Sequence, residues 1–315
     1  MIPGWLARPL PPFPHVSLLY KIRSFGLDYV VLHLGEEGTL YVTRHGWPLL
    51  EQLLPAAWYT DQKYASIGRR MSVATGTVYR VPAEAAGKTA DLLIKFSRVG
   101  QEVPIWIEPS AEAHITQQDI ANARFVGPFE EFGLCEEIRQ GAFGPPQLHI
   151  RTKSPLAIYV PPRRYQPWQL GRQDSDFDIS NNTQAEDPTH LGGAAVHLDM
   201  DRDYVLVYGW LHGDDAQVCY SRGEISREEF ESLTPMVVAE LEAKGFLMLD
   251  VKPLHFILRK RHQRRSSRTG EAAGDFLRRN GQLVYALIDY ELVVRTQPHR
   301  RWFQEQLNAS LGDCP

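Results

Sequence analysis

Near the end of the chain, two short apolar segments each carry a single aspartate, and this pair of segments restricts how the chain can fold. Residues 249–258 contain Asp250, and residues 285–291 contain Asp289, which lies 39 residues later. The apolar residues around each aspartate favour β-strands. If the two segments pair as neighbouring strands, both carboxylates come to the mouth of one cleft.

The residues around these aspartates suit the transfer of a phosphoryl group. That chemistry needs one carboxylate to orient an attacking hydroxyl, a second to hold a divalent metal, and a cation to balance the charge in transit. Lys252 stands two residues after Asp250 and supplies such a cation. The sequence therefore predicts a phosphoryl-transfer site that uses Asp250, Lys252 and Asp289.

The bulk composition is that of an ordinary globular protein. The 315 residues are 43% apolar and 23% charged, with a formal net charge of −4, so no global charge draws the chain to nucleic acid or to an anionic membrane. The three cysteines are widely spaced, which argues against a disulfide framework or a Cys-x-x-Cys metal site. The chain begins without a signal-peptide pattern and has no run of apolar residues long enough to span a membrane. We expect a cytoplasmic protein, or one delivered to the cytosol of a host by another route.

Strand patterns come first along the chain and helical patterns come later. Early strands are expected at residues 29–34, 39–43, 67–73, 77–81 and 91–96, the first two as a β-hairpin and the last three as an antiparallel meander. Pro128 begins a helix, and residues 147–150 and 156–160 predict a further β pair. Ser226 and Glu229 form a capping box that opens a second long helix.

This order predicts an α+β fold with two lobes. We expect an N-terminal extension with a β-hairpin over residues 1–63, and a β-rich first lobe with a connecting hinge over residues 64–213. A short helical second lobe is expected over residues 214–315. Residues 161–195 are rich in Arg, Gln, Asp, Asn and Pro, and we expect them to form an insertion in the first lobe.

Several motifs follow one another in the order found in the protein-kinase-like superfamily. The sequence Leu-Leu-Ile-Lys, which ends at Lys95, resembles the third-strand lysine motif of kinases. Residues 245–253 resemble the catalytic loop, with Asp250 at the position of the base. The sequence Asp-Tyr-Glu, which begins at Asp289, stands where Asp-Phe-Gly is expected. The chain therefore resembles a divergent bacterial protein-kinase-like protein, and the resemblance implies the two-lobed kinase-like fold.

The resemblance extends over residues 64–295 and implies residues that bind a nucleotide. Thr75 and Gly76 lie in a segment that resembles the second half of a glycine-rich loop, whose backbone N–H groups approach the phosphates. Tyr208 lies in a segment that resembles the strand and hinge that receive adenine. Lys95 would bind the α- and β-phosphates.

A kinase lysine of this kind is held by a carboxylate from a helix. Glu131 is our first choice for this role with Lys95, because its distance from the Gly-Pro-Pro turn at residues 144–146 resembles that in small-molecule kinases of the superfamily. Glu130 and Glu137, in the same predicted helix, remain alternatives.

The resemblance also implies a magnesium site that departs from the family pattern. Asp289 keeps the metal-binding carboxylate, and His255 occupies the place of the metal-binding Asn, although Mg²⁺ prefers oxygen ligands. Glu291 replaces the usual glycine and could offer a second carboxylate. Only 26 residues follow Asp289, too few for the segments with which protein kinases usually bind protein substrates.

These implications lead to one main function and two alternatives. The main one is an ATP-dependent phosphotransferase that uses ATP and Mg²⁺ to move the γ-phosphoryl group to a hydroxyl of a small-molecule or protein acceptor. The changes at His255 and Glu291 favour an alternative, a pseudokinase that acts as a nucleotide-binding or interaction scaffold. A basic run that starts at Arg259 and ends at Arg268 suggests contact with a polyanionic partner, although such a run also suits a solvated loop.

Overall fold

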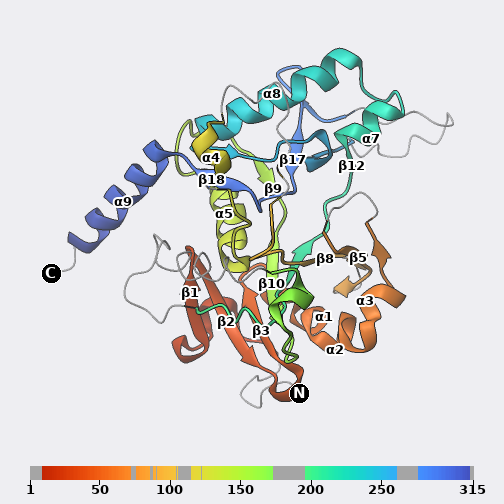
Figure 1. Ribbon diagram of the computed structural model, residues 1–315, viewed down its shortest axis with the longest axis vertical. Helices are drawn as coiled ribbons and strands as arrows, with labels where there is room; N and C mark the ends of the chain where they lie inside the picture. Colours follow the sequence, from red (N-terminus) through yellow and green to blue (C-terminus); the bar gives the residue numbers. More distant parts are fainter. Residues whose placement is uncertain are drawn as a thin grey trace.

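The computed structural model describes residues 9–71, 76–85, 88–89, 91–103, 105, 115–121, 123–172, 196–260 and 276–312. Within these residues the largest feature is an eight-stranded sheet with the order β1-β2-β3-β10-β11-β8-β5-β4 (Figure 1). Its strands are β1 (Lys21–Ser24), β2 (Leu27–His33), β3 (Thr39–Thr43), β4 (Arg69–Arg70), β5 (Val78–Val81), β8 (Leu92–Phe96), β10 (Pro155–Val160) and β11 (Val205–Gly209). Every neighbouring pair in this sheet is antiparallel. The predicted hairpin is present as β2 and β3, and the predicted meander as β4, β5 and β8.

The position of β10 differs from the prediction. The expected pairing of residues 147–150 with residues 156–160 is wrong, because β10 pairs with β3 on one edge and with β11 on the other. The strand before it, β9 (Arg151–Thr152), lies in a different sheet and runs parallel to β17 (Tyr285–Leu287). All six residues of β10 are buried, as expected for a strand with neighbours on both edges and packing on both faces. Through β10, the N-terminal hairpin becomes part of the main sheet.

Helices accompany the sheet in both halves of the chain, and the two longest lie in the second half. The α-helices are α1 (Leu50–Leu53), α2 (Pro55–Trp58), α3 (Lys63–Ser66), α4 (Gln117–Ala121), α5 (Pro128–Gln140), α7 (Ala216–Ser221), α8 (Arg227–Ala243) and α9 (Gln297–Gly312). As predicted, α5 begins at Pro128, and the capping box of Ser226 and Glu229 opens α8. In Figure 1, α9 extends away from the rest of the protein toward the C-terminus.

Short strands complete the fold and bring the two aspartate segments together. They are β6 (Glu84–Ala85), β7 (Lys88–Thr89), β12 (Asp214–Asp215), β13 (Phe246–Met248), β14 (Phe256–Leu258), β15 (Arg278–Arg279), β16 (Gln282–Leu283) and β18 (Val293–Arg295), besides β9 and β17. In the sheet with the order β12-β14-β17-β9, β14 pairs antiparallel with β17. The two aspartate segments therefore do pair as neighbouring strands.

The main sheet separates two apolar cores, because successive side chains of a strand point to opposite faces. In β11, Val205 and Val207 pack with residues of α1 and α2 on one face. Leu206 and Tyr208 of the same strand pack on the other face, with residues of α5, α8 and the short strands. The second core therefore connects the sheet to the second half of the chain, which positions the site described below.

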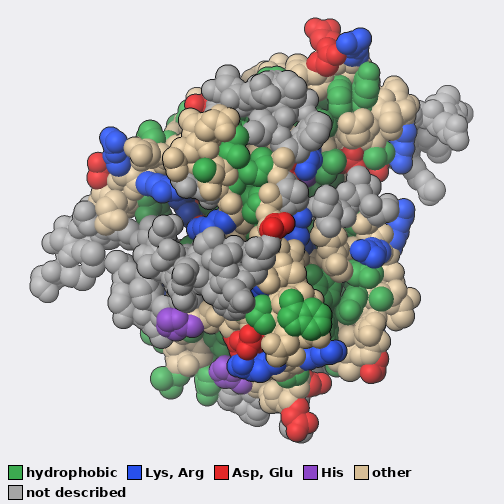
Figure 2. Space-filling model, in the orientation of Figure 1, with side chains coloured by type: hydrophobic (Ala, Val, Ile, Leu, Met, Phe, Trp, Pro, Cys, Tyr) green, Lys and Arg blue, Asp and Glu red, His purple; other side chains and the backbone are tan. Residues whose placement is uncertain are grey.

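Together these elements form an α+β fold with a large antiparallel sheet in its first half. On the face shown in Figure 2, acidic and basic side chains are interspersed. Among the described residues, no helix is long and apolar enough to cross a membrane. The proposed division at residues 63 and 213 stays a prediction. The predicted insertion lies outside the described residues from 173 onward, and the basic run lies outside them from 261 to 268.

Candidate active site

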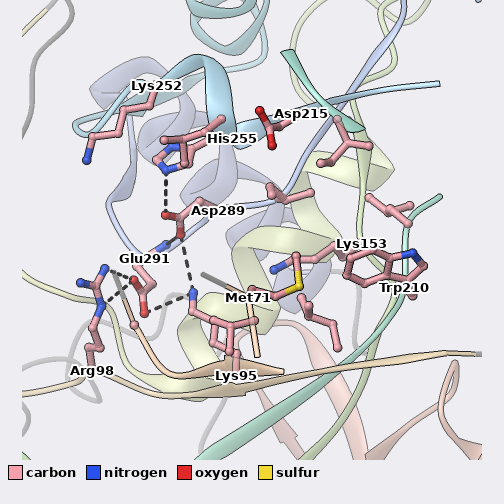
Figure 3. Close-up of a pocket in the computed structure, with 17 residues that line it drawn as sticks. Met71, Lys95, Arg98, Lys153, Trp210, Asp215, Lys252, His255, Asp289 and Glu291 are labelled. Atoms are coloured by element: carbon pink, nitrogen blue, oxygen red, sulfur yellow. Dashed lines mark hydrogen bonds and ion pairs between the residues drawn. The ribbon is translucent and has the colours of Figure 1, made fainter. Parts of the chain in front are cut away.

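A cavity of about 350 Å³ lies where β8 meets the second half of the chain (Figure 3). Its larger apolar side chains are Met71, Val78, Leu93, Trp210, Leu211, Leu254, Ile257 and Ile288. The ionisable side chains that line it are Lys95, Arg98, Lys153, Asp215, Lys252, His255, Asp289 and Glu291. Apolar walls with a small group of convergent charged residues are typical of a small-ligand site.

The period of β8 places Lys95 in this cavity. Leu92 and Ile94 pack into the core on the side of α1 and α2. The side chain of Lys95, one residue further along the strand, points to the opposite face. There Lys95 is only 7% exposed, so its ammonium group needs nearby partners.

Three carboxylates surround the Lys95 ammonium group. Its Nζ lies 2.8 Å from Glu131 Oε1, 3.2 Å from Glu291 Oε1 and 3.6 Å from Asp289 Oδ1. Burial acts to lower the pKa of Lys95, but the three carboxylates outweigh it and hold that pKa above its ordinary value. Lys95 therefore carries a positive charge at neutral pH.

Among the three candidate glutamates of α5, the structure pairs Glu131 with Lys95. Glu131 is 1% exposed, and its Oε1 also accepts a hydrogen bond of 2.7 Å from the Tyr208 hydroxyl. Glu130 instead forms an ion pair of 3.2 Å with Arg124. Glu137 forms an ion pair with Arg295. Two donors thus fix the orientation of the Glu131 carboxylate.

Asp289 and Glu291 follow β17 and face the cavity on either side of a buried aromatic residue. Tyr290 is fully buried, and its hydroxyl donates to the Leu287 carbonyl. Glu291 accepts hydrogen bonds from Arg98, at 3.1 Å from Nε and 2.5 Å from Nη2. Burial acts to raise the pKa of Asp289, but nearby positive groups, Lys95 first among them, hold it below its ordinary value. Asp289 therefore presents a carboxylate to the cavity.

Asp250 joins the same site through two neighbours. Lys252 Nζ, at the cavity wall, donates a hydrogen bond of 2.7 Å to Asp250 Oδ2. His255 lies between the two aspartates, with Nδ1 3.1 Å from the Asp250 carbonyl oxygen and Nε2 3.5 Å from Asp289 Oδ2. Lys95 and Asp289 line the cavity, whereas Asp250 does not line it and lies next to it through its contacts with Lys252 and His255.

The contacts of His255 suit a bound cation. Because a carbonyl oxygen only accepts hydrogen bonds, Nδ1 must donate to Asp250. Burial lowers the pKa of His255, although Asp289 and Asp250 oppose this, and a neutral ring then turns an Nε2 lone pair toward the Asp289 carboxylate. Two acceptor atoms 3.5 Å apart can both contact one cation that lies beside the line joining them.

This donor set fits Mg²⁺ only in combination with a ligand. Among the described residues, no group of three or more His, Cys, Asp or Glu side chains is arranged to hold a metal ion. Magnesium sites of phosphoryl-transfer enzymes commonly use one or two protein ligands, with phosphates and water completing the coordination. Asp289 and His255 are compatible with such a site.

The remaining predicted residues lie in different places. Gly76 lines the cavity, whereas Thr75 lies outside the described residues. The Tyr208 side chain does not line the cavity. It is fully buried beside α5, with its ring centroid 4.8 Å from that of Phe132.

Several cavity residues were not singled out from the sequence. Lys153 follows β9 without a recognisable motif, and Asp215 caps α7 by accepting a hydrogen bond from the Val218 N–H. Arg98 lies three residues after Lys95, and its guanidinium also packs 4.0 Å from the ring centroid of Phe125. The contact between Arg98 and Glu291 joins residues that are far apart in sequence, so no local pattern indicated that this arginine lies in the site.

Comparisons with known proteins were made on sequence and on structure. No family model and no curated protein matches the sequence. Among solved structures, the chain is similar to one described as "WaaP in complex with acyl carrier protein", with 13% sequence identity and a TM-score of 0.31, over 80% of this chain and 75% of that chain. The proposal that follows therefore depends on the side-chain geometry described above and not on this similarity.

Proposed function

We propose that this chain is an ATP-dependent phosphotransferase that moves the γ-phosphoryl group of ATP to a hydroxyl group. The observation that carries the proposal is the 2.8 Å ion pair between Lys95 and Glu131 beside Asp289 in one cavity. Kinases need this lysine–glutamate pair and the metal-binding aspartate in place together.

The cavity offers a separate place for each part of the nucleotide. Apolar side chains such as Val78, Leu254 and Trp210 suit a flat base. Lys95 binds the α- and β-phosphates. Asp289 and His255 would hold Mg²⁺, which supplies neutralisation of the phosphate charge when it is bound.

Asp250 and Lys252 act on the transferred group. The Asp250 carboxylate accepts a hydrogen bond from the acceptor hydroxyl and takes its proton as the oxygen attacks the γ-phosphorus. A new P–O bond forms, the bond from the γ-phosphorus to the bridging oxygen breaks, and ADP leaves with the electron pair of that bond. Lys252, 2.7 Å from Asp250, balances the charge on the group in transit. The acceptor would be a small metabolite, a sugar or a protein side chain.

The test is ATP turnover by purified variants. Asp250→Asn removes the base and Asp289→Asn removes the metal-binding charge, so we expect each to reduce turnover by about 10²-fold or more. Glu228→Gln, at an exposed position of α8, is the matched control and should retain full turnover. Unchanged turnover in both aspartate variants would refute the assignment.

One observation favours the second candidate, a pseudokinase scaffold. The Glu291 carboxylate lies 3.2 Å from Lys95, where it competes with a phosphate oxygen for the ammonium group. A thermal-shift titration separates the two candidates. Stabilisation by Mg-ATP with slow hydrolysis supports the enzyme, whereas metal-independent stabilisation, or none, supports the scaffold.

A further inference from the structure

A second buried lysine, Lys153, faces the same cavity as Lys95. It lies between β9 and β10, is 3% exposed and lines the cavity. Figure 3 shows its ammonium group directed into the space that Lys95 and Asp289 also face. None of the kinase-like roles proposed above uses this residue.

The ammonium group of Lys153 lacks the partners that the other buried lysines have. Lys95 contacts three carboxylates, and Lys244 donates to three backbone carbonyls, at 2.8, 3.0 and 2.7 Å. Within the described part of the chain, no hydrogen bond or ion pair of the Lys153 ammonium group is found. Its neighbours are two aromatic faces, with ring centroids 4.0 Å away for Tyr208 and 5.2 Å away for Tyr290. Because an ammonium group has three N–H donors, this cation has donors that can bind a ligand in the cavity.

The backbone of Lys153 is held firmly in place. Its N–H donates a hydrogen bond of 2.9 Å to the Tyr290 hydroxyl. Its carbonyl oxygen accepts one from Cys135 Sγ at 3.2 Å. Both partners are fully buried, so the side chain enters the cavity from a fixed point, which reduces the entropy lost when it binds a ligand.

The charges around the cavity indicate what this lysine would bind. Burial and the nearby positive charge of Lys95 lower the pKa of Lys153 to about 8. The charged form therefore predominates at neutral pH, although its surroundings disfavour it. An anion placed between Lys153 and Lys95 would offset both the burial of the Lys153 ammonium group and its repulsion by Lys95. Glu131 and Asp289 oppose this lowering of the pKa, but Glu131 and Glu291 are engaged with Lys95 and Arg98, so a ligand anion would give Lys153 a partner of its own.

We propose that Lys153 is a second nucleotide-binding cation, which donates hydrogen bonds to a phosphate oxygen of a nucleotide bound beside Lys95. This inference rests on the proposed function, because it takes the ligand to be a nucleotide. It assigns phosphate recognition to two lysines from different parts of the chain, one in β8 and one in the connection between β9 and β10. The base would then be held by the apolar walls alone.

The test compares the binding of ADP and adenosine by calorimetry to the wild type, Lys153→Met and Lys153→Arg. A charge-assisted hydrogen bond to phosphate predicts that Lys153→Met weakens ADP binding by about tenfold or more. By the same reasoning, the affinity of Lys153→Met for adenosine should stay within about twofold of the wild-type affinity. Lys153→Arg should restore part of the ADP affinity. Lys260→Met, at an exposed lysine outside the cavity, is the matched control and should bind both ligands as the wild type does.

Thermal unfolding without ligand tests whether the role of Lys153 is purely structural. Removing an unsatisfied buried cation should leave the Tm of Lys153→Met unchanged or raise it, while the shift caused by ADP shrinks. The proposal is overturned if Lys153→Met loses adenosine and ADP affinity equally, if it loses neither, or if its Tm without ligand falls by several degrees.

Inorganic tripolyphosphate separates this proposal from the proposed function. If the wild type binds tripolyphosphate in a manner that depends on Lys153 but does not bind ATP, the anion site stands and the nucleotide function fails. If the wild type binds ATP and Lys153→Met binds it equally well, the nucleotide function stands and the role of Lys153 fails.

Discussion

At the scale of single residues, the site is organised around the Lys95 ammonium group, which has three carboxylates as neighbours. Glu131 is the closest of them at 2.8 Å and is itself oriented by Tyr208. Glu291 is tied to Arg98, and Asp289 is the most exposed of the three, with 24% of its side chain accessible. Glu131 therefore serves mainly to position Lys95, whereas Asp289 remains available to a ligand.

This difference predicts distinct effects for two substitutions in one hydrogen-bonded chain. Glu131→Gln removes the charge that positions Lys95, and a misplaced phosphate-binding group can reduce phosphotransfer by about 10²-fold. Tyr208→Phe removes only one hydrogen bond to Glu131 and keeps the aromatic ring, so we expect a loss of less than about tenfold. The measurement is kcat/KM for ATP in both variants. A Tyr208→Phe enzyme as impaired as Glu131→Gln would contradict the assigned order of importance.

At the scale of elements, α5 connects the sheet to the second half of the chain. Gly133 allows the helix to approach the turn between β1 and β2 closely, since a Cβ there would lie 2.6 Å from Phe25 Cβ. Glu136 contacts Arg44 and His45, which follow β3, at 2.5 and 3.1 Å. One residue further along, the Glu137 carboxylate reaches β18 and α9. Because Glu131 lies on the same helix, contacts far from the cavity help to position Lys95.

The contact between α5 and the sheet predicts a particular response to acid. Burial acts to raise the pKa of Glu136, but hydrogen bonds and charges from His45, Gln140 and Arg44 lower it from 4.5 to about 2. A carboxylate whose pKa is lower in the folded state stabilises the protein above its unfolded pKa, and that contribution disappears as the pH falls toward the folded value. Wild-type stability should therefore decrease between pH 4.5 and about 2, and Glu136→Gln should lack this part of the decrease.

Urea denaturation at a series of pH values measures this effect. At neutral pH, Glu136→Gln should be less stable than the wild type, and the difference should narrow as the pH falls. Glu228→Gln, at an exposed position of α8, should follow the wild-type curve. A constant difference between Glu136→Gln and the wild type at every pH would show that ionisation of Glu136 contributes nothing.

At the scale of the whole molecule, the apolar core on the α5 face of the sheet crosses the boundary between the two proposed lobes. It includes Phe25 near the start of the sheet and Val293 near the end of the described chain. The core on the other face lies under α1 and α2 and shares strands β10 and β11 with the first. Because both cores depend on the same strands, we expect the protein to unfold as one cooperative unit.

Two matched substitutions test this expectation. Leu53→Ala in α1 and Leu241→Ala in α8 each remove a buried leucine, from opposite faces of the sheet. Each should cost about 2–5 kcal/mol in the free energy of unfolding. In scanning calorimetry, both variants should lower the temperature of the same single transition. Two separate transitions, with only one of them shifted by each substitution, would instead indicate lobes that unfold independently.

Much of the local structure could be predicted from the sequence, because it depends on near neighbours. Side-chain alternation located most strands of the main sheet, and Pro128 and the capping box of Ser226 and Glu229 located the starts of two helices. The pairing of the two aspartate segments was a condition of the predicted site, and the structure has it as β14 and β17. The resemblance to kinases brought out Lys95 and Asp289, which line one cavity in the structure, and Asp250, which lies next to that cavity through Lys252.

Only the tertiary structure decided which strands became neighbours and which charges met. The placement of β10 between β3 and β11 depends on burial on both faces, which a local pattern does not encode. The contact of Glu291 with Lys95 and the entry of Lys153 into the cavity each join residues far apart in the sequence. The sequence by itself therefore determined the elements and the principal charged residues. Long-range packing determined which other charged groups lie near these residues. The electrostatic energies follow from that packing, because they depend on distance and burial in the folded chain.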